Sequence, residues 1–202
     1  MKKLIAAAAL LSILNTGMLY AGEGGKMKDT FDVIFARKSV RHFTGKAVDK
    51  ADLDKMVRAG MAAPTAVNMQ PWSFVVITDR QKLDKLSDAL TVAKAHAQML
   101  NKAGAAIIVC TEPAKAFGGS ADFAVIDASL ASENILLAAE ALDLGALWTA
   151  AYPDRERMKA VRDILGIPEN VIPLNVIPIG HPTGEDKPKD KYHQEKLHWE
   201  KW

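Results

Sequence analysis

A short basic segment, RKSVRHF at Arg37–Phe43, holds the residues best suited to binding an anion. Arg37, Lys38, Ser39 and Arg41 provide two guanidinium groups, an ammonium group and a hydroxyl group within five residues. Arginine forms planar, two-pronged hydrogen bonds to phosphate, and charge-assisted hydrogen bonds are about twice as strong as neutral ones. The segment therefore predicts a phosphate site. The alternative is a solvated helix end, because cations are also favoured at helix C-termini.

A second candidate segment is APTAVNMQPW at Ala63–Trp72, in which prolines stiffen both ends of a loop. Thr65 contributes a hydroxyl group, and Asn68 and Gln70 contribute amides. An amide offers a donor and an acceptor together, which suits the N3–H and carbonyl edge of a flavin's pyrimidine ring. The alternative is a turn in which Thr65 and Asn68 satisfy the loop's own backbone.

Metal and thiol chemistry find little support in the sequence. Cys110 is the only cysteine and ends the apolar run AAIIVC, so we expect a buried core thiol and no internal disulfide. The five histidines show no paired ligand spacing with cysteines or acids, and we expect no metal site.

The first 21 residues are typical of a secretory signal peptide. Lys2 and Lys3 precede an apolar run at Leu4–Leu14, and small residues surround a cleavage site after Ala21. A retained membrane anchor is less consistent, because polar residues and a glycine at 15–17 interrupt the run before the ~20 residues that a span needs. We therefore expect a signal peptide at 1–21, export to the periplasm, one domain at 22–202 and no membrane span in the mature chain.

The charge balance argues against a nucleic-acid or membrane-surface role. The chain has 26 Lys and Arg residues against 24 Asp and Glu residues, and the leader holds two of the cations and no acids. The mature chain is then formally neutral, with 24 residues of each sign, and lacks the basic excess that such partners require.

Apolar periodicity, caps and turn residues predict alternating helices and strands. The expected helices are 29–37, 49–63, 83–90, 92–100, 121–142 and 154–166, and the expected strands are 73–78, 105–110, 146–150 and 171–180. This order indicates an α+β fold, a central mixed β-sheet flanked by helices.

Two segments carry more apolar surface than a lone domain needs. The helix at Ala121–Leu142 is apolar on most faces, which is typical of a helix buried inside a domain or between subunits. The charged C-terminal tail contains Tyr192, Leu197, Trp199 and Trp202, and we expect it to dock on another subunit.

Four segments, in order, resemble motifs of the FMN-dependent nitroreductase family. RKSVRHF is similar to its R-R-S-x-R-x-F motif, APTAVNMQPW to A-P-S-x-x-N-x-Q-P-W, and ENILLAAEALDLGALWTA to E-N-L-L-L-A-A-x-x-L-G-L-G-x-x-W-x-G. The ending PIGHPTGEDKPKDKY resembles P-x-G-x-P…K-P-R, with Lys189 in the Arg position. Lys38, Thr65 and Ala150 replace the family's Arg, Ser and Gly, and Ala150 puts the fine geometry of its segment in doubt.

The resemblance implies a homodimer with FMN at its interface. Arg37, Lys38, Ser39, Arg41 and Lys189 would hold the phosphate and ribityl chain, and cations near the ring's N1–C2=O edge would favour the anionic reduced flavin. The loop residues Pro64, Thr65 and Asn68 would line the flavin, some of them from the partner subunit, with Gln70 supporting the loop. Trp148, Thr149 and Ala150 would lie beside the ring, with a backbone N–H reaching N5.

The implied activity is an NAD(P)H-dependent oxidoreductase. Reduced flavin would pass a hydride, or two electrons with protons, to a nitroaromatic or quinone acceptor, without a side-chain acid or base. Other reductions, including reductive dehalogenation, remain open within the enzyme class. The contrasting class is a flavin-binding or electron-storage protein without significant turnover.

Overall fold

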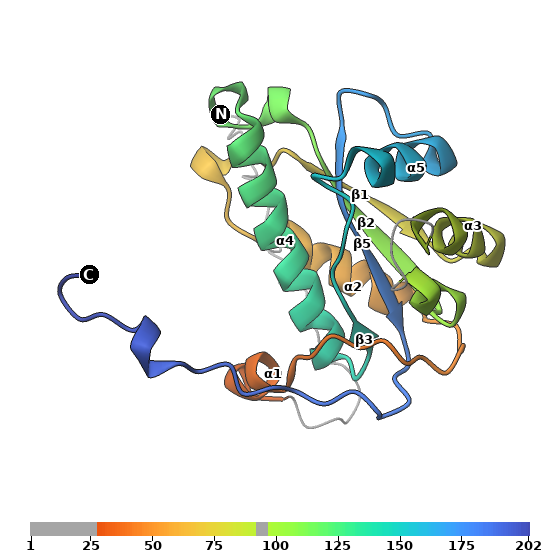
Figure 1. Ribbon diagram of the computed structural model, residues 1–202, viewed down its shortest axis with the longest axis horizontal. Coiled ribbons are helices and arrows are strands. Elements are labelled where there is room, and N and C mark those ends of the chain that lie inside the picture. The colour runs from red at the N-terminus through yellow and green to blue at the C-terminus, as the bar shows by residue number, and fades with distance from the viewer. Residues whose placement is uncertain (1–27, 92–96) are drawn as a thin grey trace, which may run out of the picture.

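A five-stranded sheet forms the centre of the structure, a computed structural model that describes residues 28–91 and 97–202 (Figure 1). The strands are β1 (Trp72–Ile77), β2 (Ala105–Thr111), β3 (Gly145–Ala146), β4 (Thr149–Ala150) and β5 (Ile172–Gly180). Their order is β1-β2-β5-β3, with β4 also paired to β5, and every one of these pairs is antiparallel. Within the described part of the chain, the parallel component is the isolated bridge between Ser39 and Ala146.

Helices cover both faces of the sheet and give three layers (Figure 1). The α-helices are α1 (Thr30–Ala36), α2 (Lys50–Met61), α3 (Arg80–Thr91), α4 (Ala121–Ala141) and α5 (Arg155–Leu165). Short 3-10 helices are η1 (Ala66–Asn68), η2 (Ala97–Asn101), η3 (Pro113–Lys115), η4 (Phe117–Gly119) and η5 (Gln194–Lys196). α2 and α4 pack together on one face, and α3 and α5 pack together on the other. The predicted α+β fold is confirmed.

Helix ends follow the cap residues expected from the sequence. The Asp29 carboxylate accepts a hydrogen bond of 2.9 Å from the Phe31 N–H and begins α1. The Asp154 carboxylate accepts two N–H groups in the first turn of α5, and Gly166, at φ 67°, ends that helix in the left-handed conformation. Local polar groups therefore fix where these helices start and stop.

The predicted strand 146–150 is interrupted, which corrects the sequence reading. β3 pairs Ala146 with Ile179 and β4 pairs Thr149 with Val176, so both keep one register to β5. The two residues between them leave the ladder without shifting it. Leu147 is buried, whereas the Trp148 side chain is 36% exposed.

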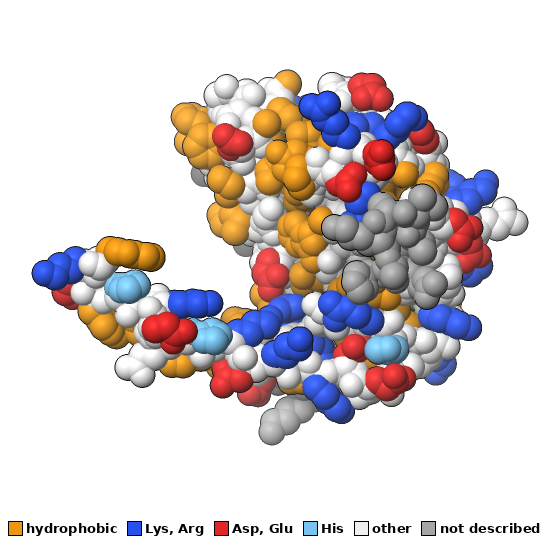
Figure 2. Space-filling view, in the orientation of Figure 1, with side chains coloured by type: hydrophobic (Ala, Val, Ile, Leu, Met, Phe, Trp, Pro, Cys, Tyr) orange, Lys and Arg blue, Asp and Glu red, His pale blue; other side chains and the backbone are white. Residues whose placement is uncertain are grey.

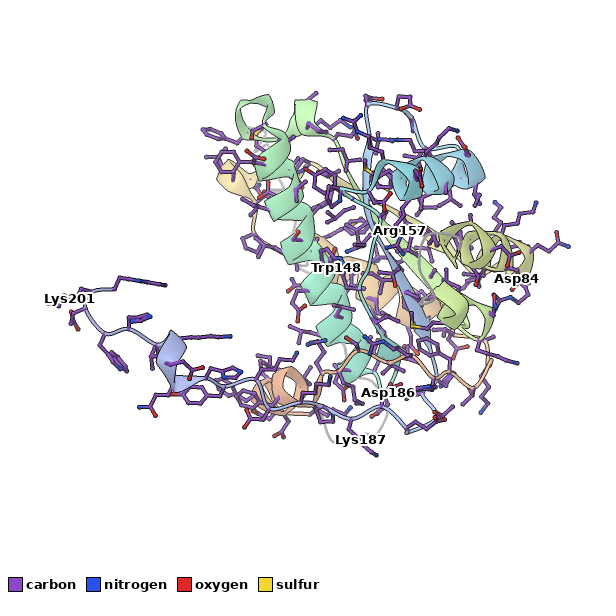
Figure 3. The ribbon with its side chains drawn as sticks, in the orientation of Figure 1. Asp84, Trp148, Arg157, Asp186, Lys187 and Lys201 are labelled. Atoms are coloured by element: carbon purple, nitrogen blue, oxygen red, sulfur yellow. The ribbon has the colours of Figure 1, made fainter. Side chains whose placement is uncertain are left out.

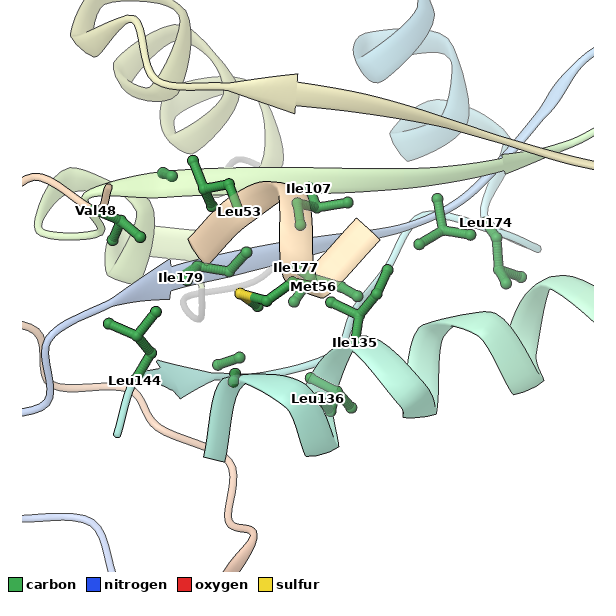
Figure 4. Close-up of a cluster of buried hydrophobic side chains, with 14 of the residues drawn as sticks. Val48, Leu53, Met56, Ile107, Ile135, Leu136, Leu144, Leu174, Ile177 and Ile179 are labelled. Atoms are coloured by element: carbon green, nitrogen blue, oxygen red, sulfur yellow. The ribbon is translucent and has the colours of Figure 1, made fainter. Parts of the chain in front are cut away.

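The main core lies between the sheet and the α2–α4 layer (Figure 4). Met56 of α2 and Ile135 of α4 meet Ile107, Ile177 and other sheet residues there, and these four side chains are fully buried. Burial of such side chains contributes roughly 1.5–3 kcal/mol each and holds the layers together.

Other expectations fall at the edges of the described residues. The predicted signal peptide lies outside the described residues. Of the predicted helix 92–100, residues 92–96 also lie outside them, and the remainder belongs to the 3-10 helix η2 (Ala97–Asn101). Among the helices that the structure describes, none combines the length and hydrophobicity needed to cross a membrane.

Candidate functional site

A cavity of about 440 Å³, called here the basic cavity, opens where the chain leaves α1. Figure 2 shows Lys and Arg side chains gathered at this end of the molecule, near the base of the tail. Six cations and two carboxylates line the cavity, which favours an anionic ligand. Its lining residues are Arg37, Lys38, Ser39, Arg41, Glu185, Asp186, Lys187, Pro188, Lys189 and Lys191.

Backbone pairing places the RKSVRHF segment between β3 and the start of the tail. Val40 donates its N–H to the Ala146 carbonyl at 3.0 Å, and Thr183 donates to the His42 carbonyl at 3.0 Å. A Cβ on Gly145 would lie 2.5 Å from Val40 Cγ1, so this close approach requires glycine. The segment is thus held from both sides.

Asp186 joins the tail directly to the basic segment. Its Oδ2 accepts the Arg41 N–H at 2.8 Å and the His42 N–H at 3.1 Å, and lies 3.2 Å from His42 Nδ1. Burial alone would raise the pKa of this carboxyl group. The hydrogen bonds from Arg41 and His42 and the charge of His42 outweigh burial and lower the pKa of Asp186. The ionised carboxylate therefore holds the backbone of Arg41 and His42 at the edge of the basic cavity.

Two of the predicted phosphate ligands already have carboxylate partners on α4. Arg37 Nε lies 3.3 Å from Glu133 Oε1, and Lys38 Nζ lies 3.0 Å from Glu140 Oε2. The Lys38 and Glu140 side chains are only 21% and 13% exposed. Lys38 therefore anchors the segment to α4 as well as lining the cavity.

A smaller cavity of about 180 Å³, called here the tryptophan cavity, adjoins the basic cavity through Arg41. Its lining residues are Arg41, Met99, Leu147, Trp148, Thr149, Ala150 and Arg157. The strand interruption at Trp148 faces the start of α5, where Arg157 lies (Figure 3). The structure thus brings the predicted Trp148–Ala150 segment beside the predicted phosphate ligands.

The predicted loop residues Pro64, Thr65, Asn68 and Gln70 lie elsewhere on the chain. The loop is held to α4 by a 3.2 Å hydrogen bond from the Ala66 N–H to Asp127 Oδ1. Glu140, beside the basic cavity, lies 13 residues further along that helix, which is about 20 Å at 1.5 Å per residue. One chain therefore does not bring this loop to the basic cavity.

The loop's polar groups bond one another, and Thr65 alone satisfies the loop's backbone in the way that the turn alternative described. Thr65 Oγ1 accepts the Gln70 N–H at 3.1 Å, and Gln70 Nε2 donates to Asn68 Oδ1 at 2.8 Å. Val67, Asn68 and Gln70 have φ values of 44°, 61° and 50°. Such values are uncommon for residues other than glycine, so the loop stores strain while presenting a rigid surface.

Sequence reasoning missed several residues of the site. Asp186 meets Arg41 across 145 positions, and no local spacing indicates such a pair. Arg157 lies in a segment, DRERMKAVRDILG, that is typical of a surface helix. Asp127 lies in an apolar run and was not singled out. A lone acid on the buried face of a helix nevertheless indicates a specific polar contact.

Cys110 is buried, as the sequence indicated. Burial raises the pKa of its thiol to about 12, despite the opposing charge of Arg162. Since the thiolate is the reactive form, Cys110 is a core residue and not a nucleophile.

Comparison with known proteins shows the family of the chain. The Nitroreductase family model matches residues 34–181. A protein of Archaeoglobus fulgidus, provisionally named NADH dehydrogenase/NAD(P)H nitroreductase, is 41% identical over 87% of this chain and 100% of its own length.

Solved structures agree with this assignment. A Bacteroides thetaiotaomicron protein with the same provisional name has a TM-score of 0.78 and 46% identity, covering 86% of this chain and 98% of its own. An FMN-dependent nitroreductase of Clostridium difficile has a TM-score of 0.77 and 27% identity, covering 85% and 99%. On the family match and the 41% identity to a relative along its whole length, the chain belongs to the nitroreductase family.

Proposed function

We propose that this chain is an FMN-dependent oxidoreductase that transfers electrons from NAD(P)H to electron-poor acceptors such as nitroaromatics or quinones. The observation that carries the proposal is the adjacency of the basic and tryptophan cavities, which share Arg41. A cofactor with a phosphate at one end and an aromatic ring system at the other needs two neighbouring sites of these kinds. The C. difficile relative is itself described as FMN-dependent, which supports the choice of cofactor.

The donor set fits the phosphate end of FMN. Four side chains of the basic cavity form no ion pair with a carboxylate among the described residues, so their charges remain for a ligand: Arg41, Lys187, Lys189 and Lys191. Arg37 shares its charge with Glu133 and is the cation nearest to α1. A phosphate bound among these groups gains charge-assisted hydrogen bonds.

The protein's contribution to the reaction is binding and orientation. When bound, the flavin supplies the hydride and electron chemistry. Arg37, Arg41 and Lys189 would hold the phosphate end, Ser39 would add a hydroxyl group, and Trp148 would line the site of the ring. Asp186 fixes the backbone of Arg41, and a 3.2 Å hydrogen bond from Arg41 Nη1 to the Ser39 carbonyl orients its side chain.

We further propose that the active form is a homodimer. Exposed apolar residues run along the outward face of α4 (Figure 2), and others lie on α1 and the tail. Pairing two chains across these surfaces would cover them and would bring one chain's Pro64–Gln70 loop to the other chain's cavities. The exposed residues are Phe31, Ile34, Phe35, Phe123, Ile126, Leu130, Tyr192, Leu197, Trp199 and Trp202.

The test of function begins with purification. We expect a yellow protein with about one FMN per chain, reduced by NADH or NADPH and reoxidised by nitroaromatics or quinones. A colourless protein that takes up no added FMN would refute the proposal. A loaded protein that is reduced but does not turn over with any acceptor would support the storage alternative.

The phosphate site is tested by Arg37→Ala, with Lys159→Ala as the control. Lys159 is an exposed cation on α5, paired only with Asp163, and lies outside both cavities. Loss of a charge-assisted hydrogen bond costs roughly 1.5–3 kcal/mol, so the FMN dissociation constant should rise by about 10- to 150-fold in Arg37→Ala. A change below threefold would mean that the basic segment is a solvated helix end.

We also propose that the chain is exported and that NAD(P)H, although it reduces the flavin in vitro, is not the physiological donor, because such nucleotides are kept in the cytoplasm. The proposal depends on the leader at 1–21, which lies outside the described residues. Fractionation of the native protein with N-terminal sequencing tests it. A cytoplasmic chain that begins at Met1 would contradict export and restore NAD(P)H as the donor.

A further inference from the structure

Arg157 places a second guanidinium group in the tryptophan cavity, opposite the segment that follows β3. The cavity contains Arg41 and Arg157 and no carboxylate among its lining residues. The Arg157 N–H donates to Asp154 Oδ1 at 3.1 Å, which fixes the residue in the first turn of α5. Figure 3 shows Arg157 and Trp148 near each other at the centre of the molecule.

Arg157 Nε is buried and has no hydrogen-bond partner among the described residues. A buried donor without an acceptor is destabilising, and the penalty is larger for a charged group. The position adds a second penalty, because the first turn of a helix carries a partial positive charge that repels cations. Asp154 and Glu156 in the same turn counter part of the second penalty, whereas the buried Nε still lacks an acceptor among the described residues.

Both penalties would be relieved by a ligand that brings negative charge or a carbonyl oxygen into the cavity. If the basic cavity, beyond Arg41, binds the phosphate as proposed, the same ligand would extend to Arg157 provided that its other end is a planar, oxygen-bearing ring. Leu147 and Trp148 provide apolar and aromatic surface for such a ring.

We infer that Arg157, together with Arg41, stabilises the negative charge that the bound flavin ring acquires on reduction. The inference rests on the proposed function. Hydride transfer from NAD(P)H moves one proton and two electrons to the ring, so the nicotinamide gains one positive charge and the ring one negative charge. A guanidinium group beside the ring binds the reduced form more tightly than the neutral oxidised form, and this difference raises the reduction potential.

The experiment separates charge from structure with three variants of the FMN-loaded protein. Arg157→Gln removes the charge and keeps a polar side chain, and Arg157→Lys restores the charge. Arg155→Gln is the matched control, because Arg155 occupies the same turn, is exposed and does not line the cavity. For each variant, the dissociation constant of oxidised FMN and the two-electron midpoint potential are measured anaerobically, with circular dichroism as a check of folding.

We expect Arg157→Gln to bind oxidised FMN within threefold of the unaltered protein and reduced FMN about tenfold more weakly. That tenfold difference corresponds to a midpoint potential about 30 mV more negative for a two-electron couple. Arg157→Lys should recover at least half of this shift, and Arg155→Gln should show none. If Arg157→Gln does not fold, the potential of Arg157→Lys relative to the control still tests the inference, because a charge-based role predicts a shift well below 30 mV.

Three outcomes would overturn the inference. An unchanged potential in Arg157→Gln, with or without a higher KM for anionic acceptors, would assign Arg157 to an acceptor or to no ligand. Equal weakening of oxidised and reduced FMN would mean that the residue only supports the cavity. Failure of the unaltered protein to bind FMN would overturn the proposed function first, and the inference with it.

Discussion

Replacing Asp186 with alanine should destabilise the protein and weaken its phosphate site together. The Asp186 carboxylate accepts N–H groups from both Arg41 and His42, and its side chain is 14% exposed. Removal would leave both N–H groups to water, and the start of the tail would lose its contact with the basic segment.

The magnitude follows from these two hydrogen bonds. A hydrogen bond to a charged group contributes roughly 1.5–3 kcal/mol, and its position near the surface lowers each value through solvent screening. We therefore expect the free energy of unfolding to fall by about 2–3 kcal/mol. For a domain of this size, Tm should decrease by about 5–10 °C. Asp186→Asn keeps one acceptor oxygen without the charge and should lose about half as much.

The pH dependence gives the sharper test. Since the folded protein lowers the pKa of Asp186, its stabilisation is complete above the ordinary value of 3.8 and is lost as the pH falls through the lowered folded value. Urea unfolding should therefore separate the unaltered protein from Asp186→Ala at pH 7, and the difference should shrink as the pH falls below 3.8. A difference below 0.5 kcal/mol at pH 7, or one that persists undiminished at low pH, would refute this account of the contact.

Three further predictions test the elements that surround the site. Gly145→Ala should lower the free energy of unfolding by about 1–3 kcal/mol in urea titrations, because its Cβ would lie 2.5 Å from Val40 Cγ1; an unchanged value would contradict the close approach. Asp127→Ala should speed amide hydrogen exchange at residues 65–70, because it frees the Ala66 N–H. The free energy of unfolding should change by no more than about 1 kcal/mol, because the substitution also removes a buried oxygen that has no hydrogen-bond partner. Unchanged exchange would show that Asp127 does not hold the loop. Deletion of Lys191–Trp202 should release monomer and FMN together in sedimentation and absorbance measurements, and a fully loaded dimer would exclude the tail from assembly.

Most helices could be predicted because their signals are local. Asp29 and Asp154 stand directly before apolar periodic runs, and Gly166 follows the last turn of α5, so caps and periodicity agree. β1 and β2 were found within a residue of their observed ends for the same reason, since short β-branched runs lie between turn residues.

From the residues alone, the site could be predicted only where neighbours in sequence form it, whereas Lys189 and the Trp148–Ala150 segment were predicted from the family resemblance. Arg37, Lys38, Ser39 and Arg41 are neighbours in sequence, whereas Asp186 reaches them through tertiary pairing of the tail. The interruption between β3 and β4 could not be predicted, because Leu147 and Trp148 are compatible with a strand in sequence. The tertiary context overrides this local preference.

The long helix α4 shows most clearly what a sequence pattern leaves open. Its hydrophobicity predicted burial without deciding whether the domain or a partner would cover it. In the structure its sheet-facing side is made largely of small residues, such as Ala124, Ala128 and Ala131, which let the helix approach the sheet closely.

Its larger apolar residues Phe123, Ile126 and Leu130 point outward and are 40–54% exposed. Because Ile135 and Leu136 are buried on the inward side, the helix carries large apolar side chains on both sides, whereas the outer face of a surface helix is usually polar. Small inward residues let the helix pack closely against the sheet, and in the outward row Phe123 makes an edge-to-face contact with Phe117, with ring centroids 5.5 Å apart. The outward row otherwise leaves large apolar side chains exposed. Its cost in exposed apolar surface is offset only if another surface covers it. The Pro64–Gln70 loop, held to the same helix at Asp127, would then lie at the edge of that contact and could reach the second chain's cavities.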